Sequence, residues 1–312
     1  MKNDVFCHIA AALLTLVALP GFGQFRSGRN YNLTVNNSNA ADRCSDLRVT
    51  SSNGVVAQVA ESATLGPGEL SALKLEDNAG RSVVQVRGWD RAEYQVETCK
   101  IAVAETQGNA EAIARGITVS RSAGRVTTFG PSVTDGNWQV YFLVRAPRNA
   151  NLDLTTQYGP IGVEGVSGDT KVRAVNGPLA LKDVGGQVDA QTQNGPISFS
   201  GRGGSVKLTA QNGPISLELM GDQWNGQQLE AKTGNGPVSI SIPENYRSGV
   251  RLQTSGHAPL SCNLPGCRNA ATDLRHFGSR TIQLNGSADT VRVSTSNGPV
   301  SVTYLGPGPR VI

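Results

Sequence analysis

Aromatic side chains are scarce in this chain of 312 residues, because Phe, Trp and Tyr together make up only 5% of it. So few large rings do not suit a thick globular core. Glycine is abundant, with 37 residues. This composition predicts a thin core lined by Val, Leu, Ile, Ala and Thr, with many turns between short strands.

The chain also lacks a block of Lys or Arg residues. Its net charge is +4 and its isoelectric point is about 8.9, and the basic residues are scattered. Such mild basicity does not indicate nucleic acid as a partner. After the N-terminal segment, no apolar run is long enough to span a bilayer, so we expect no membrane span in the mature chain.

The one long apolar run lies at residues 5–19, after the single basic residue Lys2. Pro20 ends the run, and Gly23 stands where a small residue is expected at a cleavage site. The run is shorter than the ~20 residues of a bilayer-spanning helix. We therefore predict a signal peptide over residues 1–23 and an exported, periplasmic, cell-surface or extracellular protein. An uncleaved membrane anchor is the alternative.

Cleavage would remove Cys7 and leave an even number of cysteines, which in an exported chain indicates disulfides. The cysteines that remain are Cys44, Cys99, Cys262 and Cys267. Of the three possible pairings, sequence separation favours Cys44–Cys99 and Cys262–Cys267. Zinc ligation by the second pair with His257 and His276 is an alternative, but the spacing is that of no known zinc finger. We expect no metal and no cofactor.

The tripeptide Asn-Gly-Pro recurs in the second half of the chain. It begins at Asn176, Asn194, Asn212, Asn235 and Asn297, and Tyr158 takes the place of Asn in an earlier copy. The first three Asn copies are eighteen residues apart, and apolar and polar residues alternate on both sides of each turn. Each unit is therefore predicted to hold two strands, and stacked units bury what one unit cannot. The period predicts an all-β solenoid with about eighteen residues per unit.

The repeated turn is predicted to fix the stacking. The glycines Gly177, Gly195, Gly213, Gly236 and Gly298 are expected to supply a positive φ at the corner. The asparagine side chains are expected to hydrogen-bond from unit to unit as a ladder. Five positions before each asparagine, or before Tyr158, the residues alternate in charge, namely Asp153, Lys171, Asp189, Lys207, Glu230 and Arg292. Correct stacking would place opposite charges side by side.

Outside the repeats the pattern is less regular. Residues 24–146 show no repeat and are predicted to form a mostly β region with one short helix at 109–116, either a small domain or a cap. The solenoid is predicted over residues 147–304, with an irregular insert at 243–287 that holds one imperfect unit. Residues 305–312 form a tail.

Three segments together resemble the bacterial putative adhesin domain family. They are "VVQVRGWDRAEYQVE" (83–97), "VRAPRNANLDLTTQYGPIGVEGVSGDTKVRAVNGPL" (144–179) and "VRVSTSNGPVSV" (291–302). The resemblance covers roughly residues 65–303. It implies a right-handed parallel β-helix-like solenoid, exported or membrane-anchored, with no established biochemical activity. The consistent proline after Asn-Gly and the insert with two cysteines depart from the usual pattern of the family.

The residues offer no catalytic constellation. Glycoside hydrolysis needs two carboxylates about 5–10 Å apart, but Asp153 and Asp189 are separated in their row by Lys171. No Gly-x-Ser-x-Gly elbow precedes an acid and a histidine. We predict a protein that is not an enzyme and has no catalytic residues. A carbohydrate-active β-helix enzyme and a structural protein that stacks end to end are the alternatives.

A binding function fits the outward residues better. Arg173, Gln191, Gln193, Gln211 and Lys232 are predicted to share one flat face, and Trp224 lies in a longer loop where we expect an exposed aromatic ring. Such a face could hold a surface polysaccharide or an envelope protein. The same side chains equally suit the solvated face that any solenoid presents.

Overall fold

The computed structural model describes residues 31–36, 41–66, 70–77, 80–122, 125–255, 258–262, 264, 267, 271–273, 279–286 and 288–305. Within these residues the protein is all-β with a single α-helix and one short 3-10 helix. The strands form a 12-stranded sheet, an 11-stranded sheet and a separate two-stranded sheet. The predicted signal peptide, His257 and His276 lie outside the described residues.

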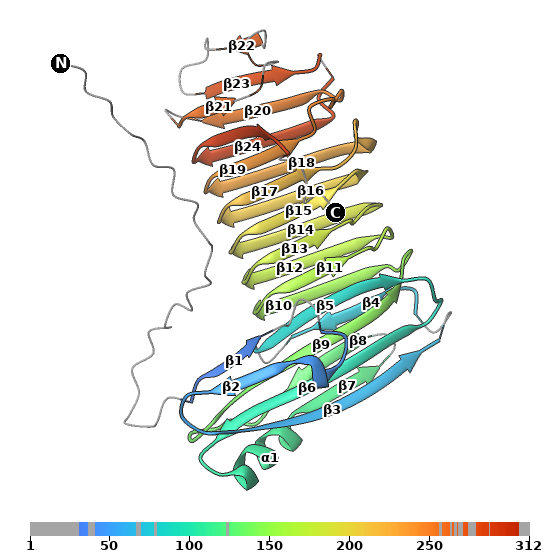
Figure 1. Ribbon diagram of the computed structural model, residues 1–312, viewed down its shortest axis with the longest axis vertical. Helices are drawn as coiled ribbons and strands as arrows, with labels where there is room; N and C mark the ends of the chain where they lie inside the picture. The colour runs from blue at the N-terminus through green and yellow to red at the C-terminus, as the bar shows by residue number, and fades with distance from the viewer. Residues whose placement is uncertain are drawn as a thin grey trace, which may run out of the picture.

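The repeats build the middle of the two long sheets. The 12-stranded sheet receives β10 (Leu152–Tyr158), β12 (Thr170–Asn176), β14 (Gln187–Asn194), β16 (Gly203–Asn212) and β18 (Asn225–Asn235). The 11-stranded sheet receives β11 (Ile161–Glu164), β13 (Leu179–Lys182), β15 (Ile197–Gly201), β17 (Ile215–Leu219) and β19 (Val238–Ile242). Successive strands alternate between the sheets, and Figure 1 shows them stacked along the long axis. We call one strand from each sheet, joined by an Asn-Gly-Pro turn or its equivalent, a unit.

The register of the strands is the one the repeat predicts. Leu154 pairs with Val172 and Val172 with Ala190, so equivalent residues of neighbouring units lie side by side. The inward side chains of both sheets are buried in one continuous core. Because only every second residue points inward, each strand contributes a few medium-sized apolar side chains. Few aromatic rings are needed to fill a core of this kind.

The asparagine ladder is confirmed at the corners. The Asn194 side chain donates to Asn176 Oδ1 at 3.0 Å, and Asn212 donates to Asn194 at the same distance. Asn235 and Asn297 continue the series at 2.8 Å each. These bonds tie each corner to the next and oppose slippage of one unit against another.

The reason for glycine at the corners differs from the expected one. Gly213 and Gly236 have φ of 158° and 155°, but Gly177, Gly195 and Gly298 are not among the glycines with positive φ. The general expectation of a positive φ was therefore wrong. A Cβ on Gly195 would lie 2.2 Å from the backbone oxygen of Gly177 in the preceding unit, and the other corners are equally tight. The corners need glycine because the backbones stack closely.

At the N-terminal end, two units lie in the reverse of their chain order. Strands β4 (Leu73–Glu76) and β5 (Ser82–Trp89) pair with β10 and β11. Strands β8 (Arg125–Phe129) and β9 (Asn137–Pro147), which come later in the chain, lie beyond them. Both sheets of the repeat region thus continue into residues 24–146. The end is completed by the antiparallel strands β3 (Val55–Leu65), β6 (Tyr94–Ala104) and β7 (Thr118–Ser122).

The predicted helix covers this end of the core. Helix α1 spans Gln107–Gly116, two residues longer at its start than expected. Thr106 caps it, because its hydroxyl accepts from the backbone N–H of Asn109 at 3.3 Å. Ala110 and Ala114 are fully buried, and the helix packs on β3 and β6. Figure 1 shows it at the opposite end of the molecule from β22 and β23.

At the C-terminal end the last unit of the chain is an interior unit. Strands β24 (Val291–Asn297) and β25 (Val300–Tyr304) lie between β18/β19 and the unit of β20 (Val250–Ser255) and β21 (Leu260–Cys262). The 12-stranded sheet then ends with antiparallel β23 (Ser279–Leu284) and β22 (Ala271–Asp273). The chain therefore forms β20/β21 first and then places β24/β25 between that unit and β18/β19. The repeat pattern alone does not predict this order.

Residues 41–51 and the strand before them form a clasp on the outer face of the 11-stranded sheet. The clasp contains β1 (Leu33–Asn36), a 3-10 helix at Cys44–Asp46 and β2 (Arg48–Ser51). It covers a second, smaller core that includes Val83, Tyr141 and Leu143. Burial there raises the pKa of Tyr141 to about 12. The Cys44–Cys99 disulfide ties the clasp to β6, and Cys262 pairs with Cys267, as sequence separation favoured.

Candidate functional site

The outer face of the 12-stranded sheet carries rows of polar side chains along the stack. The charged row pairs Asp153 with Lys171, Lys171 with Asp189, and onward to Arg292, so its alternation of sign between neighbouring units is confirmed. The next row runs through Thr155, Arg173, Gln191, Thr209, Lys232 and Ser294. Three of the predicted binding residues, Arg173, Gln191 and Lys232, thus lie in one row of this face.

Arg173 makes two ionic contacts on this face. Its guanidinium lies 3.8 Å from Asp153 and 3.6 Å from Asp189, on the strands to either side. The Gln191 side chain donates to Asp189 Oδ1 at 2.9 Å. Both distances from Arg173 exceed the range of a hydrogen bond. Its N–H groups are therefore held in position by charge while remaining able to donate.

A groove of about 390 Å³ opens beside Arg173. Its lining includes Thr155, Arg173, Val175, Gln191, Gln193 and Gln211, from β10, β12, β14 and β16. Four of the predicted binding residues therefore meet at one depression. Lys232 is not part of the lining but stands beside Thr209, which is. No carboxylate oxygen belongs to this lining within the described part of the chain.

The expected exposure of Trp224 was wrong. Its ring is only 5% exposed and packs 6.2 Å from the ring of Phe199. Its indole N–H donates to the Gly204 carbonyl at 3.0 Å, which satisfies the one polar group of the side chain. The loop folds the ring over the open edge of the apolar core because burial of so large a side chain is favourable. Trp224 therefore offers no platform to a ligand.

Tyr158 is an exposed aromatic side chain on this sheet that was not predicted as a binding residue. It ends β10, one residue after Gln157, and 59% of it is exposed. It pairs with Asn176 and so begins the corner column in which all later members are asparagine. Gly80 lies against the ring, since a Cβ on that glycine would be 3.1 Å from Tyr158 Cδ2. The sequence feature that could have identified this residue is the tyrosine itself, because the other copies have asparagine at the same position.

The outer face of the 11-stranded sheet is different in the same units. A row of small hydroxyl side chains pairs Ser198 with Ser216, Ser216 with Ser239, and Ser239 with Ser301. Ser239 donates to Ser216 at 3.3 Å, so these hydroxyls hydrogen-bond partly among themselves. The long amide and guanidinium side chains are therefore concentrated on the 12-stranded sheet.

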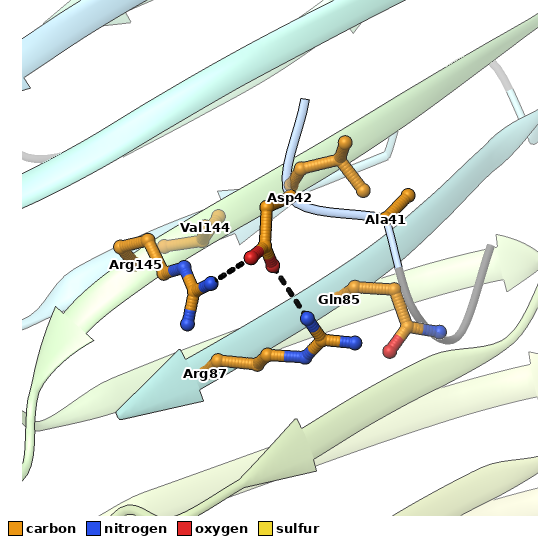
Figure 2. Close-up of a pocket in the computed structure, with 7 residues that line it drawn as sticks. Ala41, Asp42, Gln85, Arg87, Val144 and Arg145 are labelled. Carbon is orange, nitrogen blue, oxygen red and sulfur yellow. Dashed lines mark hydrogen bonds and ion pairs between the residues drawn. The ribbon is translucent and has the colours of Figure 1, made fainter. Parts of the chain in front are cut away.

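A second cluster on the 11-stranded sheet joins the clasp to the stack (Figure 2). Asp42 lies between Arg87 and Arg145, which are neighbours on β5 and β9, and forms an ion pair with each. Arg87 also lies 3.8 Å from Glu164. The space left beside these side chains is only about 10 Å³. These side chains fill the space between them, so the cluster is a structural contact between the clasp and the 11-stranded sheet.

A third depression, of about 440 Å³, lies along the corners opposite the asparagine ladder. Arg148 and Arg202 line it together with several glycines. Arg148 donates to Asp90 at 2.6 Å, and this contact lowers the pKa of the Asp90 carboxyl. Arg202 lies 3.9 Å from Asp183. Both cations thus already face a carboxylate.

No family model and no curated protein sequence matches the chain. Among the residues that the structure describes, none forms a helix long and apolar enough to cross a bilayer.

The solved structures that are similar to the chain include the following three. One is a putative cell adhesion protein from Clostridium sporogenes ATCC 15579, at 11% identity and a TM-score of 0.33, over 80% of this chain and 100% of that one. Another is a putative adhesin from Bacteroides fragilis NCTC 9343, at 7% identity and a TM-score of 0.37, over 80% and 97%. The third is a putative lipid binding protein from Parabacteroides distasonis ATCC 8503, at 8% identity and a TM-score of 0.29, over 78% and 97%. At these scores the likenesses establish neither the fold nor the function of this chain.

Proposed function

We propose that this chain is an exported, non-enzymatic interaction module of the bacterial cell envelope, related to the putative adhesin domain family. In this proposal the two long sheets form a right-handed parallel β-helix-like solenoid, and the outer face of the 12-stranded sheet contacts the partner. The observation that carries it is the convergence of Arg173, Gln191, Gln193 and Gln211 on one groove. A rigid stack can hold such side chains at fixed spacing, and so present them to a partner without paying for ordering on binding.

Export is supported by two kinds of observation. The N-terminal run has the length and the ending of a signal peptide. The Cys44–Cys99 disulfide joins residues 55 positions apart, and stable disulfides are typical of oxidising compartments.

The first test is the location and processing of the full chain. We expect bacteria that express it with a C-terminal tag to hold a product shortened at its N terminus, outside the cytoplasm. The purified product should bind isolated cell envelopes, and a variant with Arg173→Ala and Gln193→Ala should bind less. A full-length product confined to the cytoplasm, or equal envelope binding by the variant, would contradict the proposal.

One observation favours a second function, the cleavage of a polysaccharide. Asp153 and Asp189 flank Arg173, and paired carboxylates are the usual machinery of glycoside hydrolysis. Both acids are ion-paired to the same guanidinium, and neither lines the groove. We expect no new reducing ends and no unsaturated products when the protein is incubated with polysaccharides. Turnover that Asp153→Asn abolishes would replace the binding function by an enzymatic one.

A further inference from the structure

The groove beside Arg173 has almost no local excess of charge. On the strands that line it, Asp153 and Asp189 place two negative charges at its edge. Lys171, Arg173 and Lys207 place three positive charges in the same area, so the local sum is only +1. Each of these cations has a carboxylate on a neighbouring strand, which leaves a polyanion little net attraction and a polycation none. The charge balance therefore favours an uncharged ligand.

The polar groups of the groove can both donate and accept hydrogen bonds. A side-chain amide has two N–H donors and a carbonyl acceptor. The amides of Gln193 and Gln211 are exposed, and neither has a hydrogen-bond partner among the described residues. Hydroxyl groups also donate and accept at the same atom. Amides on neighbouring strands, about 4.8 Å apart, thus suit a molecule that carries hydroxyls at regular intervals.

The groove also offers apolar surface to one side of such a molecule. Val175 interrupts the row of glutamines between Gln157 and Gln193, and it is half-buried in the lining of the groove. Tyr158 does not line the groove, but it ends the strand whose Thr155 and Thr156 do, and more than half of its surface is exposed. Aromatic rings present a flat apolar face together with a polar tip. A sugar ring has a complementary form, with C–H groups on its faces and hydroxyls around its edge.

We propose that this groove binds an uncharged glycan, with Gln193, Gln211 and Arg173 hydrogen-bonded to its hydroxyls and Tyr158 packed on a sugar ring. The inference deepens the proposed function, since it names the ligand class of the face already assigned to a partner. It assigns Tyr158 a direct contact with the ligand and gives Trp224 a structural role only.

The test compares neutral and acidic polysaccharides with the purified mature protein. The neutral probes are dextran, mannan and a soluble β-glucan, and the acidic probes are alginate and hyaluronate, in affinity electrophoresis and titration calorimetry. We expect at least one neutral probe to bind with an affinity that changes little from low to high salt, because no net charge is neutralised. Tyr158→Ala, and Gln193→Ala with Gln211→Ala, should each weaken binding about tenfold or more.

Matched controls come from the same sheet. Phe129 is also an exposed aromatic, 54% exposed, and Gln253 is an exposed outward glutamine on β20 outside the groove. Phe129→Ala and Gln253→Ala should bind as the parent protein does. All variants replace exposed side chains, so their thermal unfolding should match the parent, and this is measured alongside.

Three results would overturn the inference. They are the absence of binding to every neutral probe, equal binding by the groove variants and the parent, and binding of the acidic probes alone with a steep loss at high salt. Each of these leaves the proposed function standing if the processed protein still binds envelopes through the 12-stranded sheet. Loss of export or of envelope binding would instead contradict the proposed function itself.

Discussion

At both ends of the stack two units lie in the reverse of their chain order, and different parts of the chain neutralise the like charges that this brings together. At the N-terminal end β4/β5 lies inside β8/β9, and at the C-terminal end β24/β25 lies inside β20/β21. Each reversal puts two arginines side by side on neighbouring strands. They are Arg87 with Arg145 at one end, and Arg251 with Arg292 at the other. In the middle of the stack the charged row alternates in sign instead.

An aspartate from outside the strands bridges each arginine pair. Asp289 lies 3.2 Å from Arg251 and 3.4 Å from Arg292, and it precedes β24 by two residues. Asp42, which bridges the other pair, belongs to the clasp and comes from a distant part of the chain. In the regular repeat, charges on neighbouring strands neutralise one another. Where units lie out of order, like charges meet, and an aspartate from outside the strands is needed to neutralise them.

Removal of the last unit should have the largest effect. Truncation after residue 286 deletes β24 and β25, whose Val291, Val293, Val300 and Val302 are buried. Burial of each such side chain contributes about 1.5–3 kcal/mol, so we expect the C-terminal end to lose its cooperative unfolding and become sensitive to protease. Truncation after Leu305 is the control and should leave the melting temperature unchanged. Parent-like stability of the shorter chain would show that β20/β21 can occupy the vacated place.

Loss of the clasp disulfide should come next. Cys44→Ala with Cys99→Ala removes a link across 55 residues, for which the chain-entropy model gives about 4 kcal/mol of the free energy of unfolding. Cys262→Ala with Cys267→Ala opens a loop of only 5 residues and should cost about half as much. Denaturant unfolding of both pairs measures the difference. Equal losses would mean that the two ends depend on their disulfides alike.

The bridging aspartates should have smaller effects, which differ between the ends. Asp289 has a side chain 18% exposed and Asp42 one 43% exposed, so water screens the second more. We expect Asp289→Asn to lower the free energy of unfolding by about 1–2 kcal/mol and Asp42→Asn by about 1 kcal/mol or less. High salt should reduce both losses. A variant with Asp289→Asn and Arg251→Gln should recover part of the loss, because it also removes the repulsion.

The ladder should show the smallest effect per residue. Asn194→Ala removes one bond that Asn194 donates and one that it accepts, whereas Asn176→Ala removes only the bond from Asn194. At about 1 kcal/mol or less for each bond, the first loss should be about twice the second. Thermal unfolding of the two variants checks this ratio. Identical losses would mean that the ladder acts through the turn conformation instead of through its bonds.

The regular part of the molecule could be predicted from the sequence because its information is local. The columns around Asn176, Asn194 and Asn212 define both the inward faces and the partner of every strand. The arrangement of the ends could not be predicted, because it depends on contacts between distant segments. Strand β3 shows this, because its partner β6 follows only after β4 and β5 in the chain, and neither strand belongs to the repeat.

The same distinction applies to the candidate site, where residues within the repeat were predictable and residues in irregular loops were not. Arg173, Gln191, Gln193 and Gln211 follow from the repeat, which places outward residues in rows. Trp224 does not, since the loop that carries it has no counterpart in the other units. Its ring was expected in solvent and instead closes an edge of the core. Tyr158 stood within the repeat and could have been found as the member of its column that departs from asparagine.

The position of β24 and β25 also bears on the synthesis of the chain. These strands leave the ribosome after β18, β19, β20 and β21, yet they lie between the two units that those four strands form. A nascent chain that has emerged only as far as residue 286 holds β18, β19, β20 and β21 without the strands that separate them. The native order at this end therefore becomes available only after residue 304 has left the ribosome, and until then β18/β19 and β20/β21 must not pair with each other in place of β24/β25.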